Sequence, residues 1–412
     1  MPNTSGNRWR VVLGAILIQF CLGAIYAWSV FTPTLNEAGW SNVQTQAVFS
    51  VGLAFFALVM VWAGKRLTKW GPRRLAVIAG LVLGLGYVLA GLIGKTNFWL
   101  NTLFIGVIGG SGIGLGYVVP IAVGMRWYPD RKGLITGLAV AGFGFGAMGW
   151  IKLAGSWGNL LERTGLSMTF IIYGVLFAAL TLLGSIWMVF PADEPKNNPE
   201  IKTARDSKAL RSHEMVRTGS FYLIFFTFVI TAGAGLMSIG LMKLYPMEAL
   251  QRSGHTAAAA SAIAGTAMAV YFSLANGLGR ILWGLISDRI GQRPAIILMA
   301  VLQGLMMMAM IYTAGQPVLL YASALIIGFN FGGNFSLFPT LTADTFGAAH
   351  VGENYPFVFL AYGVGGILMP ILGGILGDLG NFPLAFALCG FLCWVGALLI
   401  RFIKKPLLKP GV

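Results

Sequence analysis

The sequence has few charged residues and very few acidic ones. Only 10% of its 412 residues are Asp, Glu, Lys or Arg, and just 13 are acidic. Soluble domains carry about 25% charged residues, so this scarcity excludes a soluble globular protein. The residues present are instead 57% hydrophobic, with a mean hydropathy of +0.78. This composition indicates a protein that crosses a membrane several times.

Cysteine is also scarce, and the three residues present lie in apolar runs. Cys21, Cys389 and Cys393 lack the spacing of a zinc site and do not support a disulfide framework. The sequence contains no recognisable nucleophile–base pair or metal-binding cluster, so we expect no enzyme activity, no cofactor and no metal. The Gly-rich stretches 110–116 and 142–149 lie inside apolar segments with no preceding strand, which predicts close helix packing rather than nucleotide binding.

Long apolar runs are what the sequence does have. A membrane-spanning helix needs about 20 mainly apolar residues. Twelve segments meet this requirement: 10–36, 43–64, 73–95, 98–126, 131–155, 168–190, 219–245, 256–285, 293–313, 317–343, 354–377 and 381–403. The first is too long for the apolar part of a signal peptide. We expect an all-α membrane protein with six-helix bundles at 1–190 and 219–412, joined by a cytoplasmic linker at 191–218.

The formal net charge of +15 would suggest nucleic-acid binding in a soluble protein. Here, most of the 28 lysines and arginines fall in alternate loops and near both ends of the chain. This distribution follows the positive-inside rule. It predicts an inner (plasma) membrane protein with both termini in the cytoplasm. We expect the lipid bilayer as its surroundings, no nucleic-acid partner and no obligate protein partner.

Two motifs recur at the same spacing in the two halves. GKRLTKWGPRR begins at Gly64 and GLISDRIGQR begins at Gly284, 220 residues later. AGFGFG at 141–146 and AYGVGG at 361–366 share that spacing. The halves are therefore predicted to be parallel repeats. Transporters built from such repeats hold their substrate between the halves, near the middle of the membrane.

The second-half motif resembles the loop signature of the major facilitator superfamily. Its residues Gly284, Asp288, Arg289, Gly291 and Arg293 follow the pattern G-x-x-x-D-R-x-G-x-R. The resemblance implies that Asp288, Arg289 and Arg293 act in a conformational gate.

The first-half copy of the motif keeps Gly64, Lys69, Gly71 and Arg73. The resemblance implies a gate role for Gly64 and Gly71 as well. Thr68 replaces the acidic residue, which predicts weaker ion pairing in this copy.

Further motifs narrow the resemblance. WYPDRKGLITGLAVAG (127–142) resembles the motif that leads into the fifth helix of monocarboxylate transporters, and it contains Arg131, a further gate candidate. GAIYAWSVF (23–31) is similar to their first helix, without its usual acid. SLFPTLTADTFG (336–347) and ENYPFVF (353–359) are similar to segments of oxalate/formate antiporters. The resemblance implies a twelve-helix carrier of small carboxylates, similar to bacterial lactate transporters.

One arginine lies inside the eighth apolar segment. Arg280 would cost about 2.5–3.5 kcal/mol at the middle of a bilayer unless it faced water or an anion. Because a guanidinium can bind a carboxylate through two parallel hydrogen bonds, we expect Arg280 to bind the substrate. Pairing with Asp344 or Glu353, or snorkelling, is the structural alternative. Asn276, one turn earlier, is expected to bind a substrate hydroxyl or orient Arg280, with a helix–helix hydrogen bond as the alternative.

The number of buried cations favours a substrate with one carboxylate. The resemblance to oxalate/formate antiporters implies a second buried cation on helix eleven, but Tyr362 stands at that position. A dianion beside a single arginine would leave an uncompensated charge in a medium of low dielectric constant. We therefore expect a monocarboxylate such as lactate or pyruvate.

Aromatic side chains are expected to form the walls of the site. Rings suit a small pocket with few polar groups, although each could equally pack against lipid or other helices. Phe331 and Phe335 lie one turn apart and share a helix face. The expected substrate-binding residues are Arg280, Asn276, Tyr117, Tyr362, Phe331, Phe335, Phe359, Tyr26, Trp28 and Phe143.

The predicted spans contain no acidic residue near the middle of the membrane. His255, Asp344 and Glu353 are candidates for proton coupling, and the proton could instead travel on the substrate. We expect symport of a monocarboxylate with a proton. Carboxylate exchange and a non-transporting sensor are the alternatives. The sequence leaves the preferred acid and its chirality, the stoichiometry, the oligomeric state and the direction of transport open.

Overall fold

The computed structural model describes residues 4–40, 42–94, 96–155, 158–191, 209–242 and 244–404. Their secondary structure is helical, and these residues contain no strand. Twelve helices in them are long and apolar enough to cross a membrane, judged by length and composition. The all-α fold with twelve membrane helices is thus confirmed. Most of the predicted linker, residues 192–208, lies outside the described residues.

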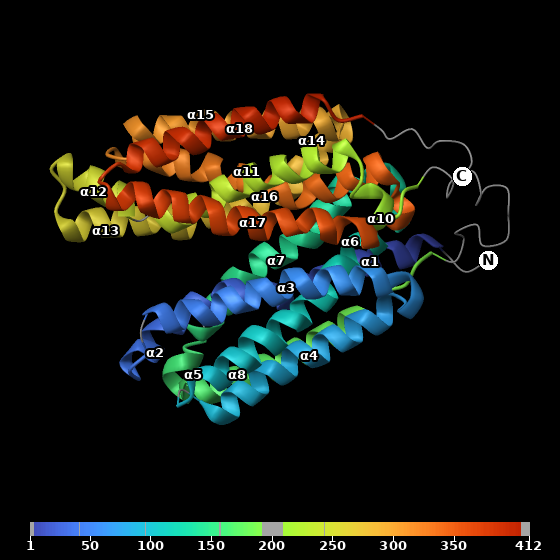
Figure 1. The fold of residues 1–412 in the computed structure, drawn as a ribbon. Coiled ribbons are helices and arrows are strands. Elements are labelled where there is room, and N and C mark those ends of the chain that lie inside the picture. The colour runs from blue at the N-terminus through green and yellow to red at the C-terminus, as the bar shows by residue number, and fades with distance from the viewer. Residues whose placement is uncertain are drawn as a thin grey trace. The chain divides into compact units, whose positions relative to one another are not determined.

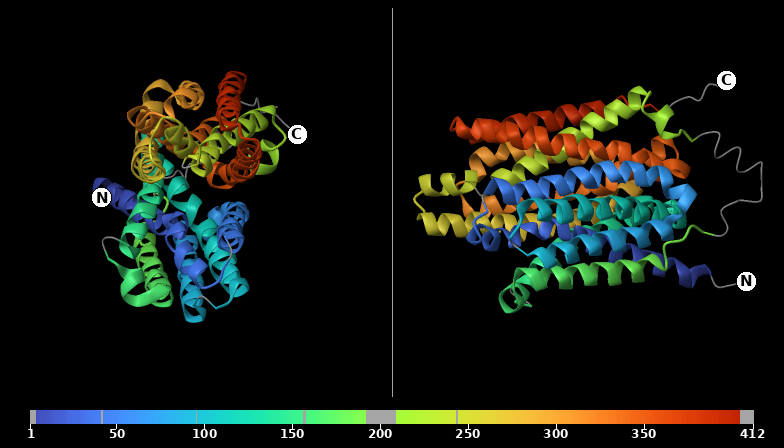
Figure 2. Two further views of the ribbon diagram at one scale, coloured as in Figure 1. Left: turned by 90° about the vertical axis from the view of Figure 1, so that its left-hand side faces the viewer. Right: turned by 60° about the horizontal axis from the view of Figure 1, so that its bottom comes forward.

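The chain divides into two compact units, and the long helices within each run alongside one another (Figures 1 and 2). The first unit comprises Met1–Pro129, Leu138–Thr203 and Val351–Pro356. Its helices, with the 3₁₀ helix η1 and the π-helical segment η2, are α1 (Thr4–Leu22), η1 (Gly23–Val30), α2 (Thr32–Glu37), α3 (Asn42–Trp70), α4 (Pro72–Ile93), α5 (Phe98–Asn101), η2 (Thr102–Gly109), α6 (Gly110–Trp127), most of α7 (Lys132–Ala154) and α8 (Leu160–Ser185).

The second unit comprises Asp130–Gly137, Ala204–His350 and Phe357–Val412. It therefore includes the first residues of α7, and α17 runs from the first unit into the second. Its helices, with the π-helical segment η4 and the 3₁₀ helix η5, are α10 (Ser212–Met215), α11 (Gly219–Leu241), α12 (Leu244–Arg252), α13 (Ala257–Thr266), η4 (Ala267–Phe272), α14 (Ser273–Ile290), α15 (Gln292–Thr313), α16 (Pro317–Phe346), η5 (Ala348–His350), α17 (Val351–Asp378) and α18 (Phe382–Arg401).

Small residues let helices within each unit pack closely. In the first unit, α4 packs along α8, where Gly84 and Gly174 meet backbone to backbone. In the second, α14 packs along α16, and α15 along α18. Helices in lipid gain little from burying apolar surface against one another, so this close backbone contact supplies much of their association.

Several spans extend beyond their predicted ends. The second continues from residue 64 to Trp70 and the eighth from residue 285 to Ile290, and the sixth begins at Leu160 instead of 168, across a kink at Gly165. The added turns carry charges, among them Lys65, Arg66 and Glu162. Charged residues lower the hydropathy of a segment without stopping its helical hydrogen bonding, so the apolar run ends before the helix does.

The repeated motif produces the same backbone turn in both halves. Gly71, between α3 and α4, has φ +82°, and Gly291, between α14 and α15, has φ +90°. Glycine adopts such angles without the steric cost that a side chain would add. The 220-residue repeat read from the sequence is therefore also a repeat of local structure.

Candidate functional site

Arg280 is deeply buried in α14, as only 1% of its surface is exposed. Among the described residues, it is the one charged side chain in the buried set. Its Nε donates to Asn276 Oδ1 at 3.3 Å, and its Cζ lies 4.2 Å from the centre of the Phe335 ring. The amide of Asn276 thus contacts one edge of the guanidinium, and the ring of Phe335 contacts one face. An aromatic ring attracts a cation through its quadrupole.

Four predicted aromatic residues come together beside this arginine. Phe335 lies 5.3 Å from Phe331 and 5.5 Å from Tyr362, measured between ring centres. Phe359 stacks on Tyr362 at 5.2 Å. All four are buried. Helices α14, α16 and α17 therefore contribute the six predicted site residues of the second unit to one cluster.

Three of the four predicted residues in the first unit form a second cluster. Phe143 of α7 lies 5.2 Å from Tyr26 and 5.4 Å from Tyr117, and Phe56 packs 5.1 Å from Tyr117. Tyr117 and Phe143 are almost fully buried, whereas Tyr26 is half-buried. Phe56 was not among the predicted residues, because an isolated phenylalanine in an apolar helix carries no sequence signal of its own.

Trp28 belongs to a different group of rings. Its indole packs against Phe31 and Phe170, and its Nε1 donates to the carbonyl of Thr45 at 2.8 Å. It also borders an apolar cavity of about 10 Å³ that Tyr87 helps to line, enough for about one water molecule. The structure thus separates Trp28 from the Tyr26, Tyr117 and Phe143 cluster.

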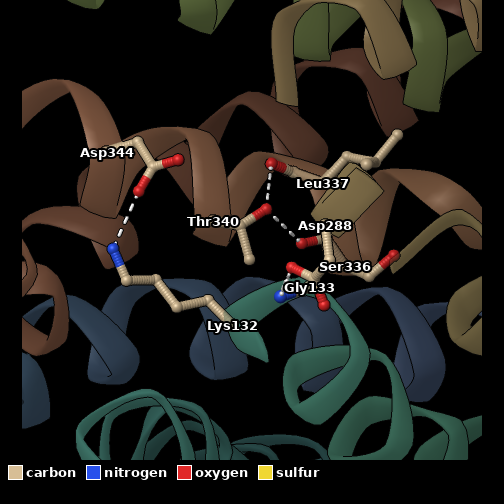
Figure 3. Close-up of polar contacts among 7 residues, drawn as sticks. All are labelled: Lys132, Gly133, Asp288, Ser336, Leu337, Thr340 and Asp344. Atoms are coloured by element: carbon tan, nitrogen blue, oxygen red, sulfur yellow. Dashed lines mark hydrogen bonds and ion pairs between the residues drawn. The ribbon is translucent and has the colours of Figure 1, made fainter. Parts of the chain in front are cut away.

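The predicted gate residue Asp288 caps the start of α7. Its two carboxylate oxygens accept hydrogen bonds from the backbone N–H groups of Gly133 and Leu134, each at 2.8 Å (Figure 3). The first N–H groups of a helix have no partner within it, and a negative charge there also complements the helix dipole. Beside this cap, the backbone of Gly133 packs on that of Gly284 so tightly that a Cβ on either would collide with the other's carbonyl oxygen.

An ion pair lies next to the cap. Lys132 Nζ is 2.9 Å from Asp344 Oδ1, and both side chains are partly exposed. Figure 3 shows the pair extending from the start of α7 to α16, near Thr340, whose hydroxyl donates within α16 itself. Lys132 was not among the predicted site residues. Its pairing depends on α7 and α16 meeting here, which spacing along the chain does not reveal.

The other gate candidates differ in burial and packing. Arg131 and Arg289 are exposed. Arg293 is half-buried and lines a surface cavity of about 440 Å³ together with Asp344. Gly71 forms the turn described above. Gly64 packs against Gly352, where a Cβ would collide with the Gly352 carbonyl oxygen.

The three proton-coupling candidates lie at or near the ends of helices α13, α16 and α17. His255 is half-buried, next to Thr256, which caps α13. Asp344 binds Lys132, and Glu353 lies in the first turn of α17. None of the potential metal ligands among the described His, Cys, Asp and Glu residues cluster in groups of three or more.

The fold and these clusters can be compared with known proteins. The model of the Major Facilitator Superfamily matches residues 11–271 and 254–411. The chain belongs to the Major Facilitator Superfamily. It is therefore a membrane transporter of this superfamily, and the resemblance read from the loop motif is confirmed.

Individual relatives fit this assignment. The chain is 31% identical over 369 residues to the uncharacterized MFS-type transporter YhjX of Escherichia coli, covering 89% of this chain and 87% of that one. It is 25% identical to the oxalate:formate antiporter of Oxalobacter formigenes, covering 98% and 93% of the two chains. Similarity to the oxalate/formate branch is thus confirmed.

A solved structure shares the fold. The crystal structure of the transporter FucP in the outward conformation superposes with a TM-score of 0.72, covering 96% of this chain and 99% of that one. The sequences are 17% identical, so this similarity concerns the fold alone.

Proposed function

We propose that this transporter carries a small monocarboxylate of the lactate or pyruvate type, together with a proton, across the cell membrane. The supporting observation is the buried Arg280, held by Asn276 and Phe335. A lone buried cation suits one carboxylate, because a dianion would bring an extra unpaired charge into a medium of low dielectric constant. Both termini are proposed to lie in the cytoplasm.

In this proposal the substrate carboxylate binds the guanidinium of Arg280. Asn276 orients that guanidinium through its Nε or binds a substrate hydroxyl. The rings of Phe331, Phe335, Phe359 and Tyr362, with Tyr26, Tyr117 and Phe143 of the first unit, exclude water around the apolar part of the acid. Excluding water strengthens the attraction between carboxylate and guanidinium.

Transport then needs the site to open to each side in turn. We propose that the two six-helix halves, 1–190 and 219–412, rock to alternate access, as repeat-built carriers do. The Asp288 cap and the contact of Gly64 with Gly352 act as gates in this cycle. The proton is proposed to bind at His255, Asp344 or Glu353, or to travel on the substrate.

Exchange of one carboxylate for another is the second candidate. It is favoured by the amide of Asn276 beside Arg280, because an amide cannot carry a proton. It is also favoured by the similarity to an oxalate:formate antiporter. If the carrier moves an anion without a proton, net charge crosses the membrane unless a second anion is carried back.

Uptake of labelled L-lactate into proteoliposomes tests the proposal. We expect an inward proton gradient to drive accumulation into vesicles that contain buffer alone. Arg280→Ala should reduce uptake by about 30-fold or more, since removing one partner of a buried charge pair costs about 2–5 kcal/mol. Arg280→Lys should retain part of the uptake because it keeps the charge and loses the planar fork.

The matched control is Arg252→Ala, which removes an exposed arginine of α12 paired with Glu248 and should leave uptake unchanged. Uptake only into vesicles preloaded with a carboxylate would replace symport by exchange. Binding of lactate without uptake in either arrangement would indicate a sensor. Neither binding nor uptake of lactate or pyruvate would refute a monocarboxylate substrate.

A further inference from the structure

Helices α14 and α16 touch directly beside Arg280. A Cβ at Gly332 of α16 would collide with the carbonyl oxygen of Asn276, and one at Gly279 of α14 would collide with that of Phe329. A Cβ at Gly332 would also lie 3.1 Å from Asn276 Oδ1, the atom that accepts from Arg280. At these two glycines the backbones of α14 and α16 are in direct contact. A small shift of α16 would therefore displace Asn276 and, with it, the arginine.

One buried hydrogen bond joins the two helices at this contact. Trp283 Nε1 donates to Asn330 Oδ1 at 3.2 Å, and both side chains are at most 2% exposed. Trp283 follows Arg280 by three residues, so the two side chains are neighbours on α14. Asn330 directly precedes Phe331. The bond therefore lies one helical turn from the contact between Arg280 and Phe335.

A second buried hydrogen bond ties α16 to α11. Thr231 Oγ1 donates to Asn334 Oδ1 at 2.6 Å, and the amide nitrogen of Asn334 donates to the carbonyl of Phe331 at 3.1 Å. Asn334 directly precedes Phe335. Polar groups in a buried network favour a single arrangement, because any other arrangement leaves a buried group without a partner. The helix that carries Phe331 and Phe335 is thus fixed on two sides.

We propose that Trp283 and Asn330 are positioning residues for the carboxylate site. Their hydrogen bond holds α16 at the distance where Phe335 lies against the Arg280 guanidinium and Gly332 lies against Asn276. The ring and the amide together fix the plane of the guanidinium, and a carboxylate can form two parallel hydrogen bonds only with a guanidinium in a fixed plane. This inference rests on the proposed function for its ligand, but the geometry can be tested without one.

Binding of L-lactate and pyruvate to the purified full-length protein gives the first test. Asn330→Leu and the milder Trp283→Phe each remove one partner of the bond. Each should raise Kd and the KM of uptake about 3- to 10-fold, the loss expected for one buried hydrogen bond, with the maximal rate retained. The control is Ser323→Ala, which removes a partly buried hydrogen bond of α16, from Ser323 to Thr313 at 2.9 Å, and should leave Kd unchanged.

A double-mutant cycle separates positioning from general stability. In a Phe335→Leu background, the ring that Asn330 positions is already absent. Asn330→Leu should then raise Kd by a smaller factor than it does alone, since residues that act through one another are not additive. Additive losses, or an equal loss in Ser323→Ala, would overturn the proposal.

Fluorine NMR of protein carrying 4-fluorophenylalanine at position 335 tests the geometry with no ligand present. Asn330→Leu and Trp283→Phe should move the signal toward its position in Arg280→Gln, and Ser323→Ala should leave it in place. A signal unmoved in both variants would overturn the inference. If neither lactate nor pyruvate binds the unmodified protein, the proposed substrate fails, and this signal decides the positioning role by itself.

Discussion

The starts of α7 and α17 invite comparison because the sequence repeat relates them. Gly133 and Gly352 lie 219 residues apart. Gly133 packs on Gly284 of one motif copy, and Gly352 packs on Gly64 of the other. Close backbone contact therefore recurs in both halves.

The residues that form the cap and the ion pair at the start of α7 are not repeated in the sequence. Asp288 caps α7, whereas Thr68, the corresponding residue of the first motif copy, is exposed. Lys132 and Asp344 form an ion pair, but the residues 219 positions away are Val351 and Met125. The duplicated helices thus share the same backbone fit, while Asp288, Lys132 and Asp344 have no charged counterpart at the positions that the repeat relates to them. We expect changes of charge at these three residues to matter more than changes at Thr68, Val351 and Met125.

The largest effect is expected from adding a methyl group at the paired glycines. Gly133→Ala should cost about 3 kcal/mol or more, the upper end of the range for overpacking, because the new Cβ meets the Gly284 carbonyl oxygen, Ser287 Oγ and Asp288 Oδ1 together. Gly352→Ala should cost less, because its Cβ meets the end of the Leu67 side chain, which can rotate away. Thermal unfolding midpoints in detergent would measure both. Equal losses at the two glycines would contradict this difference.

An intermediate effect is expected from the cap. Asp288→Asn replaces one charged acceptor by an amide, which can accept only one of the two backbone hydrogen bonds well. It should cost about 1.5–3 kcal/mol, the value of hydrogen bonds to a charged group. Thr68→Ala should stay within about 0.5 kcal/mol, as surface changes do. Unfolding midpoints and uptake rates measured together would check this, and a Thr68 variant as damaged as the Asp288 variant would refute the asymmetry.

The smallest effect is expected from the ion pair. Lys132→Gln or Asp344→Asn should cost about 0.2–1 kcal/mol, because partly exposed pairs are screened by solvent. The cost should shrink in high salt. Exchanging the two residues, Lys132→Asp with Asp344→Lys, should restore the stability lost in each single charge reversal. A loss that is insensitive to salt and is not restored by the exchange would show that the charges do not act as a pair.

Parts of this protein could be predicted from local sequence and others could not. The twelve spans follow from apolar runs, but some of their ends were misplaced, for example where charged turns continue a helix beyond its apolar run. Arg280 was found because a charge in an apolar segment is costly wherever the helix lies. Lys132, Trp283 and Asn330 were missed, because ordinary loop and core residues acquire their partners only when helices distant in sequence meet.

The sequence by itself determined the membrane fold, the repeat, and the lone arginine with its asparagine one turn away. All three depend on hydropathy or on spacing along a single helix, which the chain carries locally. Only the tertiary structure decided that Phe335 is the ring on Arg280, that Trp28 packs in a different cluster, and that Asp288 caps α7 while Asp344 binds Lys132. Those contacts join separate helices, and their geometry is set by how closely the glycine-lined backbones approach.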